Sequence, residues 1–149
     1  MLVKLNERVE DQEVAELLSY SVFPTAEALG RATGRYRGET DSELLGLEEE
    51  GRLVGIAGVR AEEDGVMTIL HLAVHPELRG NGYGRGLLLE LIAERRPSAL
   101  IAETDAEAVD FYRSVGFVIT SLGDERYGVE RFLCRYDVEE DEQDEQPDE

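Results

Sequence analysis

The spacing of apolar residues along this 149-residue chain predicts an ordered series of strands and helices. Short runs of alternating or contiguous apolar residues indicate strands, whereas apolar residues three and four positions apart indicate the buried face of a helix. The predicted strands cover residues 2–5, 43–48, 52–61, 66–74, 99–103, 117–122 and 129–138. The predicted helices cover residues 9–22, 25–33, a segment that follows a glycine-rich stretch and ends before Pro97, and residues 105–115. This order predicts a mixed sheet with helices packed on its faces.

Residues that cap helices lie where these helices are expected to begin and end. Asp11 and Thr25 precede the first two helical patterns, and both residue types accept hydrogen bonds from the free N–H groups of a first turn. Asp105 or Thr104 can cap the last helix, and Gly116 follows it where a left-handed glycine is common. The local signals therefore agree with the apolar pattern.

The stretch HPELRGNGYGRGLLLELI, residues 75–92, places four glycines directly before a leucine-rich helical pattern. A glycine inside a helix costs about 0.5–1 kcal/mol relative to alanine, so the arrangement needs a compensating use. The first turn of a helix exposes unpaired N–H groups and the positive end of the helix dipole, and it attracts phosphate. Glycines remove the side chains that would keep a phosphate away. The stretch is therefore predicted to bind an anion, with Arg79 and Arg85 adding positive charge.

Two common phosphate-binding motifs are absent from this stretch. A P-loop requires Gly-Lys-Ser/Thr, and a G-x-G-x-x-G motif would require glycine where Arg85 or Leu87 stands. The stretch does contain R-x-x-G-x-G from Arg79 to Gly84. Together with its flanks, residues 72–91, this run resembles the pyrophosphate-binding loop of the GNAT acetyltransferase superfamily. The segment AVDFYRSVGF, residues 108–117, resembles the second signature of that family, so the resemblance extends over roughly residues 2–138.

The resemblance implies an α+β, three-layer fold with a mixed, mostly antiparallel central sheet of about seven strands and about four flanking helices. It also implies acetyl-CoA as co-substrate, without a metal. The backbone of Leu72, Ala73 and Val74 would pair with the acetyl carbonyl and the pantetheine amides in a gap between two strands. The implied pyrophosphate-binding residues are Arg79, Gly80, Asn81, Gly82, Tyr83, Gly84 and Arg85. Asp105 stands where the family often has asparagine, and it would bring an anionic group near the cofactor.

By the same resemblance, Tyr112 occupies the position of the family's usual general acid, which protonates the departing coenzyme A thiolate. A phenol with a pKa near ~10 is a weaker acid than a thiol with a pKa near ~8.5, so the site must favour the tyrosinate or the transfer must be concerted. The alternative interpretation is that Tyr112 is a core aromatic beside Phe111.

Two residues are candidates for the general base that the reaction needs. His71 lies in the strand beside the expected thioester site, and strand alternation places it on one face with Ile69 and Ala73. A packed histidine is the alternative interpretation. Glu103 ends the following strand, where a solvated strand end is the alternative. Leu100 stands where the branch acting on ribosomal-protein N-termini carries a catalytic glutamate, which argues against that route.

Acidic residues outnumber basic ones by 34 to 15 and give a net charge of −19. Nine of the acidic residues lie in residues 137–149, and we expect a disordered tail over 139–149 after a domain of residues 1–138. The charge argues against nucleic-acid binding, which needs a basic surface. No apolar run reaches the ~18–20 residues of a membrane helix, and the N-terminus lacks a signal-peptide pattern. We therefore expect a cytoplasmic protein that binds neither nucleic acid nor membrane.

Cys134 is the only cysteine, so an internal disulfide is excluded. No group of cysteine and histidine residues has the spacing of metal ligands. Because Cys134 falls within the last strand pattern, a buried packing role is expected rather than that of a nucleophile.

The resemblance thus implies an acetyl-CoA-dependent N-acetyltransferase that acts on a primary amine of a small molecule or protein by direct attack in a ternary complex. The alternatives are a non-catalytic CoA-binding module of the same fold, an interaction protein that acts through its acidic tail, and an unrelated nucleotide-binding domain. Residues 24–42 and 123–128 are expected to shape the acceptor pocket, but they carry no motif that names the acceptor. The sequence also leaves open whether the chain forms a homodimer.

Overall fold

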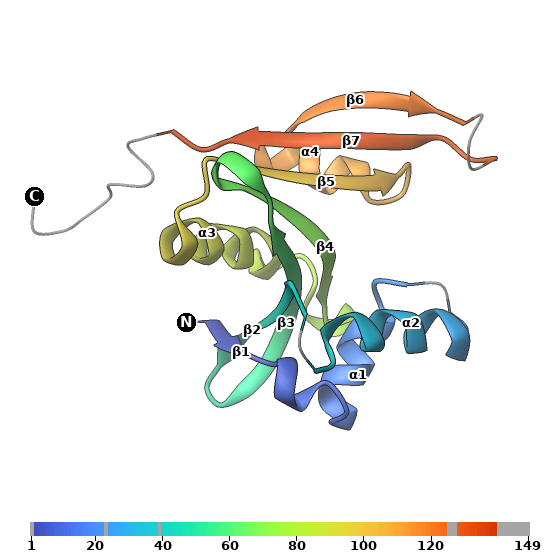
Figure 1. Cartoon of the computed structure of the whole chain (residues 1–149), viewed down its shortest axis with the longest axis vertical. Coiled ribbons are helices and arrows are strands. Elements are labelled where there is room, and N and C mark those ends of the chain that lie inside the picture. The colour runs from blue at the N-terminus through green and yellow to red at the C-terminus, as the bar shows by residue number, and fades with distance from the viewer. Residues whose placement is uncertain (1, 23, 39, 125–127, 140–149) are drawn as a thin grey trace, which may run out of the picture.

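Seven strands form one twisted sheet that has helices on both faces (Figure 1). The computed structural model describes residues 2–22, 24–38, 40–124 and 128–139. The strands are β1 (Leu2–Lys4), β2 (Ser42–Glu49), β3 (Arg52–Ala61), β4 (Val66–Val74), β5 (Ala99–Asp105), β6 (Val118–Gly123) and β7 (Arg131–Asp137). The helices are α1 (Gln12–Ser19), α2 (Ala26–Tyr36), α3 (Tyr83–Arg95) and α4 (Val109–Val115), with 3-10 turns at Asn6–Arg8, Glu63–Gly65 and Pro76–Leu78.

The strands lie in the order β1-β2-β3-β4-β5-β7-β6. Every neighbouring pair is antiparallel except β4 and β5, which run parallel and are connected through α3. The mixed, mostly antiparallel sheet predicted for the chain is therefore confirmed.

The parallel pair β4 and β5 stays together over only half of its length. Pairing begins at Val66 with Ala99 and ends at Ile69 with Ala102. Beyond this point β5 continues to pair with β7 as far as Asp105, whereas β4 remains paired with β3. The two strands consequently diverge, and the edge of β4 that faces β5 is left without a strand partner. We call this divergence the strand break.

Two clusters of buried apolar side chains hold the helices to the sheet. On one face, α3 and α4 pack over the middle strands through residues that include Leu88, Leu91 and Tyr112. On the other face, α1 and α2 pack through residues that include Leu17 and Tyr36. Each fully buried leucine contributes about 1.5–3 kcal/mol to folding through the hydrophobic effect. We refer to the two sides as the α3/α4 face and the α1/α2 face.

A β-bulge in β4 lies at the strand break. Ile69 pairs with Val59 and His71 pairs with Gly58, so Leu70 between them has no opposing residue. An extra residue of this kind interrupts the alternation of side chains between the two faces. Ile69 belongs to the core of the α3/α4 face, whereas His71 contacts α2 on the other face.

The bulge corrects one expectation from the sequence. His71 and Ala73 do lie on the same face, since Ala73 belongs to the cluster of the α1/α2 face. Ile69 lies on the opposite face, so the expectation that it shares a face with His71 was wrong. Strict alternation fails here because it assumes an unbroken register with β3.

The predicted helices differ from the observed ones mainly at their ends. The last helix begins at Val109 rather than at residue 105, because Asp105 still pairs with Arg131 in the sheet. The second helix continues to Tyr36, whose buried ring ties the helix end to the core. Asp11 does stand at the start of α1, but its carboxylate pairs with Arg8 instead of capping the helix.

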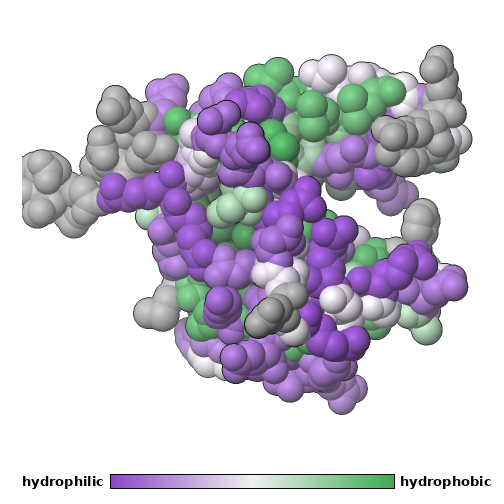
Figure 2. All heavy atoms as spheres, viewed as in Figure 1, coloured by the Kyte–Doolittle hydropathy of each residue, from purple (hydrophilic) through white to green (hydrophobic). Residues whose placement is uncertain are grey.

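The β6–β7 hairpin exposes several apolar side chains in an otherwise polar surface. Figure 2 shows hydrophobic residues over this part of the molecule and an open notch between it and α2. The exposed apolar residues on the hairpin are Val118, Leu122, Val129 and Leu133. Residues 125–127, within the segment 123–128 that is expected to help shape the acceptor pocket, lie outside the described residues. So do residues 140–149, which make up most of the predicted acidic tail. No helix within the described ranges is long and apolar enough to cross a membrane.

Candidate active site

The loop between β4 and α3 presents its backbone, not side chains, to the surrounding space. Gly80 and Gly82 have φ values of 85° and 83°, which L-residues with a side chain rarely adopt. A Cβ added at either glycine would meet no atom within 4 Å, so the space over the loop is open. Gly82 is the N-cap of α3, and no side chain caps that end. The positive end of a 13-residue helix therefore points into open space.

The other two glycines of the stretch, Gly84 and Gly86, lie within α3 and have different surroundings. A Cβ added at Gly84 would lie 3.0 Å from Cε1 of Phe111, so glycine allows α3 to approach α4 closely. A Cβ added at Gly86 would meet no atom within 4 Å. Thus Gly80 and Gly82 shape the loop, whereas Gly84 serves helix packing.

Side chains within the loop hold its shape. The Nε group of Arg79 donates a hydrogen bond of 3.2 Å to the carbonyl of Val74. Its guanidinium group also lies over the ring of Tyr20, 5.9 Å from the ring centroid. The side chain of Asn81 donates to the carbonyl of Leu78 at 2.9 Å. Arg79 thereby links the end of α1 to the loop.

A pocket of about 580 Å³ extends from the end of β4 across the loop to α4. Its volume is in the range of small-molecule and cofactor sites. The residues that line it are Tyr20, Leu72, Ala73, Val74, Leu78, Arg79, Gly80, Gly82, Tyr83, Gly84, Arg85, Glu107, Ala108, Phe111, Tyr112, Ser114 and Val115. Of Tyr112 and the predicted cofactor-binding residues, only Asn81 and Asp105 are absent from this lining.

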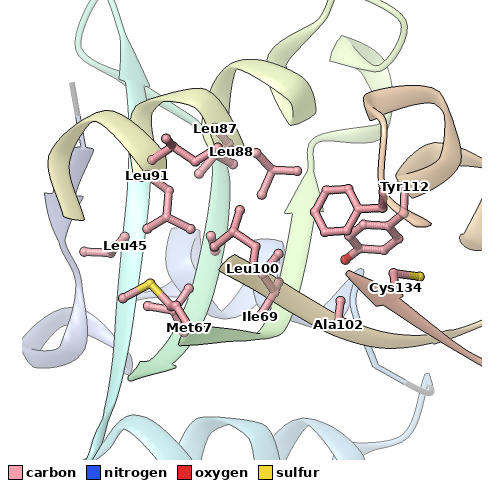
Figure 3. Close-up of a cluster of buried hydrophobic side chains, with 14 of the residues drawn as sticks. Leu45, Met67, Ile69, Leu87, Leu88, Leu91, Leu100, Ala102, Tyr112 and Cys134 are labelled. Atoms are coloured by element: carbon pink, nitrogen blue, oxygen red, sulfur yellow. The ribbon is translucent and has the colours of Figure 1, made fainter. Parts of the chain in front are cut away.

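Tyr112 is buried at the inner end of the pocket, with only 6% of its surface exposed. Its ring packs edge-on against Phe111 and Phe117, at centroid distances of 5.2 and 5.1 Å. Figure 3 shows Tyr112 beside Cys134 at one end of the buried cluster. Burial raises the pKa of the Tyr112 phenol, and the nearby Cys134 raises it further. Tyr112 therefore keeps its proton at neutral pH.

Cys134 is fully buried within β7. Burial raises the pKa of its thiol, which disfavours the thiolate that a nucleophile requires. It does not line the pocket, and the expected packing role agrees with its position in the core.

Asp105 closes a turn next to the pocket. Its carboxylate accepts hydrogen bonds of 3.1 Å from the backbone N–H groups of Glu107 and Ala108. The carboxylate thus shapes the approach to α4 from outside the pocket lining, and Glu107 provides the acidic side chain of that lining.

The two candidate bases lie on the α1/α2 face. The Nδ1 atom of His71 is 2.5 Å from the hydroxyl oxygen of Tyr36, and burial lowers the pKa of His71 to about 4. Glu103 is exposed, and its carboxylate forms an ion pair with Arg131 at 3.3 Å. Ala102 packs into the core on the α3/α4 face, so the neighbouring Glu103 points to the opposite side. Neither side chain lines the 580 Å³ pocket.

Several residues that line the pocket were not predicted from the sequence as site residues. Tyr20 reaches the pocket from the end of α1, more than fifty residues from the glycine loop. Glu107 directly precedes the second signature and Ser114 lies within it, but neither residue was a candidate from the sequence. Phe111 also lines the pocket, and its position next to Tyr112 in that signature is the signal that could have pointed to the pocket wall.

The lining residues fit the acetyl-CoA implied by the resemblance. Open space lies over Gly80 and Gly82 at the positive end of α3, where a pyrophosphate needs N–H donors and no side chain in its way. Arg79 and Arg85 line the same region. The unpaired edge of β4 beyond the strand break offers backbone groups to an amide-bearing chain. Within the described ranges, no group of three or more His, Cys, Asp or Glu residues could hold a metal ion.

Comparison with known families gives one match over most of the chain. The model of the acetyltransferase (GNAT) domain matches residues 7–132. A mycothiol acetyltransferase from Stackebrandtia nassauensis is 33% identical in an alignment of 100 residues that covers 60% of this chain and 32% of the relative. The chain therefore spans about one third of the length of that relative.

Solved structures share the fold at low sequence identity. A GNAT-family structure from Desulfovibrio desulfuricans aligns with a TM-score of 0.76 at 21% identity, over 93% of this chain and 99% of the other. An acetyltransferase from Bacillus subtilis, solved in complex with CoA, aligns with a TM-score of 0.64 at 15% identity, over 87% of this chain and 93% of the other. The architecture observed here thus recurs in proteins that bind CoA.

Proposed function

The chain belongs to the GNAT acetyltransferases, and on this basis we propose that it transfers the acetyl group of acetyl-CoA to a primary amine by direct attack in a ternary complex. The observation that carries this proposal is one continuous pocket that joins an uncapped helix N-terminus, an unpaired strand edge and a buried tyrosine. In this proposal the helix N-terminus would bind the pyrophosphate, the strand edge would bind the pantetheine chain, and the tyrosine would be the proton donor.

Backbone groups supply most of the binding in this proposal. The N–H groups of residues 82–85 would donate to the pyrophosphate at the start of α3, and Arg79 and Arg85 would add charge. Leu72 and Val74 would pair with the amides of the pantetheine chain along the free edge of β4. Their fixed N–H groups would also stabilise negative charge on the acetyl carbonyl oxygen, because donors fixed in advance need no reorganisation.

Acetyl-CoA carries its acetyl group as an activated thioester. During transfer the amine nitrogen forms a bond to the acetyl carbon while the carbon–sulfur bond breaks. Tyr112 would give its proton to the departing sulfur. Since burial raises the pKa of Tyr112, this proton transfer must accompany the bond breaking rather than precede it.

The attacking amine must lose a proton before or during its attack. Glu103 is one candidate to accept this proton, because its carboxylate is exposed on the α1/α2 face beside the strand break. His71 is the second candidate on that face. Entry of the acceptor from the α1/α2 face would leave the α3/α4 face to acetyl-CoA.

The experiment that tests the proposal measures free thiol released from acetyl-CoA in the presence of a panel of primary amines. Mass spectrometry then identifies the acetylated product. We expect thiol release that depends on an amine and matches the acetylated product mole for mole. Acetyl-CoA binding without acetylation of any amine would instead favour a non-catalytic CoA-binding module.

A further inference from the structure

A buried tyrosine and a half-buried histidine form a close pair beside the strand break. The hydroxyl oxygen of Tyr36, at the end of α2, lies 2.5 Å from Nδ1 of His71 in β4. The two rings meet edge-on, with their centroids 5.6 Å apart and their planes at 65°. Tyr36 has no exposed surface. The contact joins α2 to the sheet at the position where β5 has left β4.

Two features of the neighbouring backbone make room for the Tyr36–His71 contact. Gly58 of β3 pairs with His71, and a Cβ at Gly58 would lie only 1.7 Å from the Tyr36 hydroxyl oxygen. Only glycine therefore leaves room for the hydroxyl group. The bulge at Leu70 turns His71 toward α2. Both features fix the ring of His71 in one place.

The position of the shared proton follows from the surroundings of Tyr36. Its hydroxyl group has one hydrogen-bonding partner among the described residues, which is Nδ1 of His71. Burial raises the pKa of Tyr36 and lowers that of His71, so both groups are neutral at pH 7. A buried O–H group without an acceptor is costly. Tyr36 therefore donates its proton to Nδ1, and the ring hydrogen of the neutral His71 must lie on Nε2.

The Nε2 atom of His71 is open to a ligand. No described residue is hydrogen-bonded to it, and no buried side-chain nitrogen or oxygen in the described ranges lacks a partner. Solvent must therefore reach Nε2. Because the Tyr36 hydroxyl group occupies the Nδ1 edge of the ring, the Nε2 edge lies on the side of the ring away from that hydroxyl group. The nearby Arg35 adds positive charge, which further opposes protonation of the ring.

We propose that His71 donates a hydrogen bond from Nε2–H to the acceptor substrate at the strand break, and that Tyr36 is the positioning residue that holds His71 in this donor form. The inference rests on the proposed function and names a class of acceptor. This class is an amine that carries a carbonyl or hydroxyl oxygen near its reacting nitrogen. A neutral donor at this position binds such an oxygen and does not repel an incoming ammonium group. His71 then cannot be the general base, since Nε2 already holds a hydrogen.

Nitrogen NMR of protein with isotope-labelled histidine tests the proton position without any turnover. The chain has two histidines, and the His71→Asn variant assigns their signals. At pH 7 we expect His71 to show a protonated Nε2 and an unprotonated Nδ1. In Tyr36→Phe we expect this single form to give way to a mixture of the two tautomers. A proton on Nδ1 in the wild type would overturn the proposal.

Two matched substitutions separate donation from proton acceptance. The amide of His71→Gln can place an N–H donor near the position of Nε2, whereas that of His71→Asn reaches only as far as Nδ1. Neither amide can accept a proton from an ammonium group. With phenylalaninamide as the probe amine, we expect kcat/KM for the amine to be at least tenfold higher in the Gln variant than in the Asn variant. The KM for acetyl-CoA should be the same in both.

A second probe amine tests the class of acceptor. Phenethylamine has the same ring and amine as phenylalaninamide but no carboxamide. We expect the wild type to prefer phenylalaninamide, and His71→Asn to lose this preference. Equal loss of activity in the Gln and Asn variants would overturn the proposal and restore His71 as a base. Failure of the wild type to acetylate any amine would contradict the proposed function. The NMR measurement tests the hydrogen bond between Tyr36 and His71 independently of acetylation.

Discussion

Ile69 of β4 and Ala102 of β5 are the last residues that pair before the two central strands diverge. Both side chains are buried in the core of the α3/α4 face, so core packing fixes the position at which the two strands begin to diverge. Beyond it, β4 keeps an unpaired edge that leads directly into the glycine loop. An edge of this kind can pair with an extended, amide-bearing ligand. The strand break thus gives a continuous path from the start of α3 to Tyr112.

Two glycines of α3 should respond differently to substitution by alanine. Gly86→Ala should raise the free energy of unfolding by about 0.5–1 kcal/mol, because the site is helical and its Cβ would meet no atom within 4 Å. Gly84→Ala should give less than this or destabilise the protein, because its Cβ would lie 3.0 Å from Phe111. Urea unfolding of both variants measures the difference. Equal stabilisation by the two substitutions would show that α3 and α4 do not need the close approach at Gly84.

Tyr112→Phe should lower kcat by about 10²–10⁴-fold, the usual contribution of a general acid or base. The dissociation constant for acetyl-CoA should stay within a factor of about three, because the ring and its packing remain. Single-turnover kinetics and calorimetry measure the two quantities. Unchanged kcat would mean that Tyr112 is a core aromatic and that another group protonates the thiolate.

The pH dependence of the same reaction provides a second check on Tyr112. Burial raises the pKa of this phenol above its usual value near ~10, so the acid remains protonated throughout the neutral and mildly alkaline range. The wild-type kcat should therefore show no fall from ionisation of Tyr112 below pH ~10. A fall near pH 8 that disappears in Tyr112→Phe would show that the site instead favours the tyrosinate.

The stability of the protein should depend on His71 below neutral pH. The pKa of His71 is lowered to about 4 in the folded chain, from 6.5 for an unperturbed histidine. Between these values the unfolded chain binds the proton that the folded chain excludes, so this contribution is present above pH ~6.5 and is lost as the pH falls toward ~4. Its full size is of the order of 3 kcal/mol, since one pKa unit corresponds to about 1.4 kcal/mol.

Unfolding free energies at pH 4.5, 5.5 and 7 in the wild type and in His71→Asn measure this contribution. The wild type should lose more stability than the variant as the pH falls. The carboxylates titrate in both proteins, so the difference between them isolates His71. Parallel curves for the two proteins would contradict a buried, neutral His71.

The sequence predicted the parts of the site that lie within one continuous segment. Arg79, Gly80 and Gly82 form the loop within a few residues, so their spacing alone indicated an anion site at a helix start. The element order and the mixed sheet followed in the same way from local periodicity. Sequence signals were sufficient here because the loop and the helix that it precedes are neighbours along the chain.

The rest of the site depends on contacts between distant segments. The bulge at Leu70 exists only in the pairing of β4 with β3, so periodicity within β4 misplaced Ile69 relative to His71. Tyr20 reaches the glycine loop from the end of α1, Tyr36 reaches β4 from α2, and neither belongs to a motif. The strand break likewise depends on where β5 leaves β4, which no single segment encodes.

Calorimetric titration with acetyl-CoA tests the central claim most directly, using the wild type and two glycine variants. Gly82→Glu places a side chain and a negative charge in the open space over the loop. Gly123→Glu is the matched control, because Gly123 also has a positive φ and open space but does not line the pocket. We expect micromolar binding by the wild type and by Gly123→Glu, and an affinity at least tenfold lower in Gly82→Glu. Absence of binding to the wild type, or equal affinities in all three proteins, would contradict acetyl-CoA binding at the glycine loop.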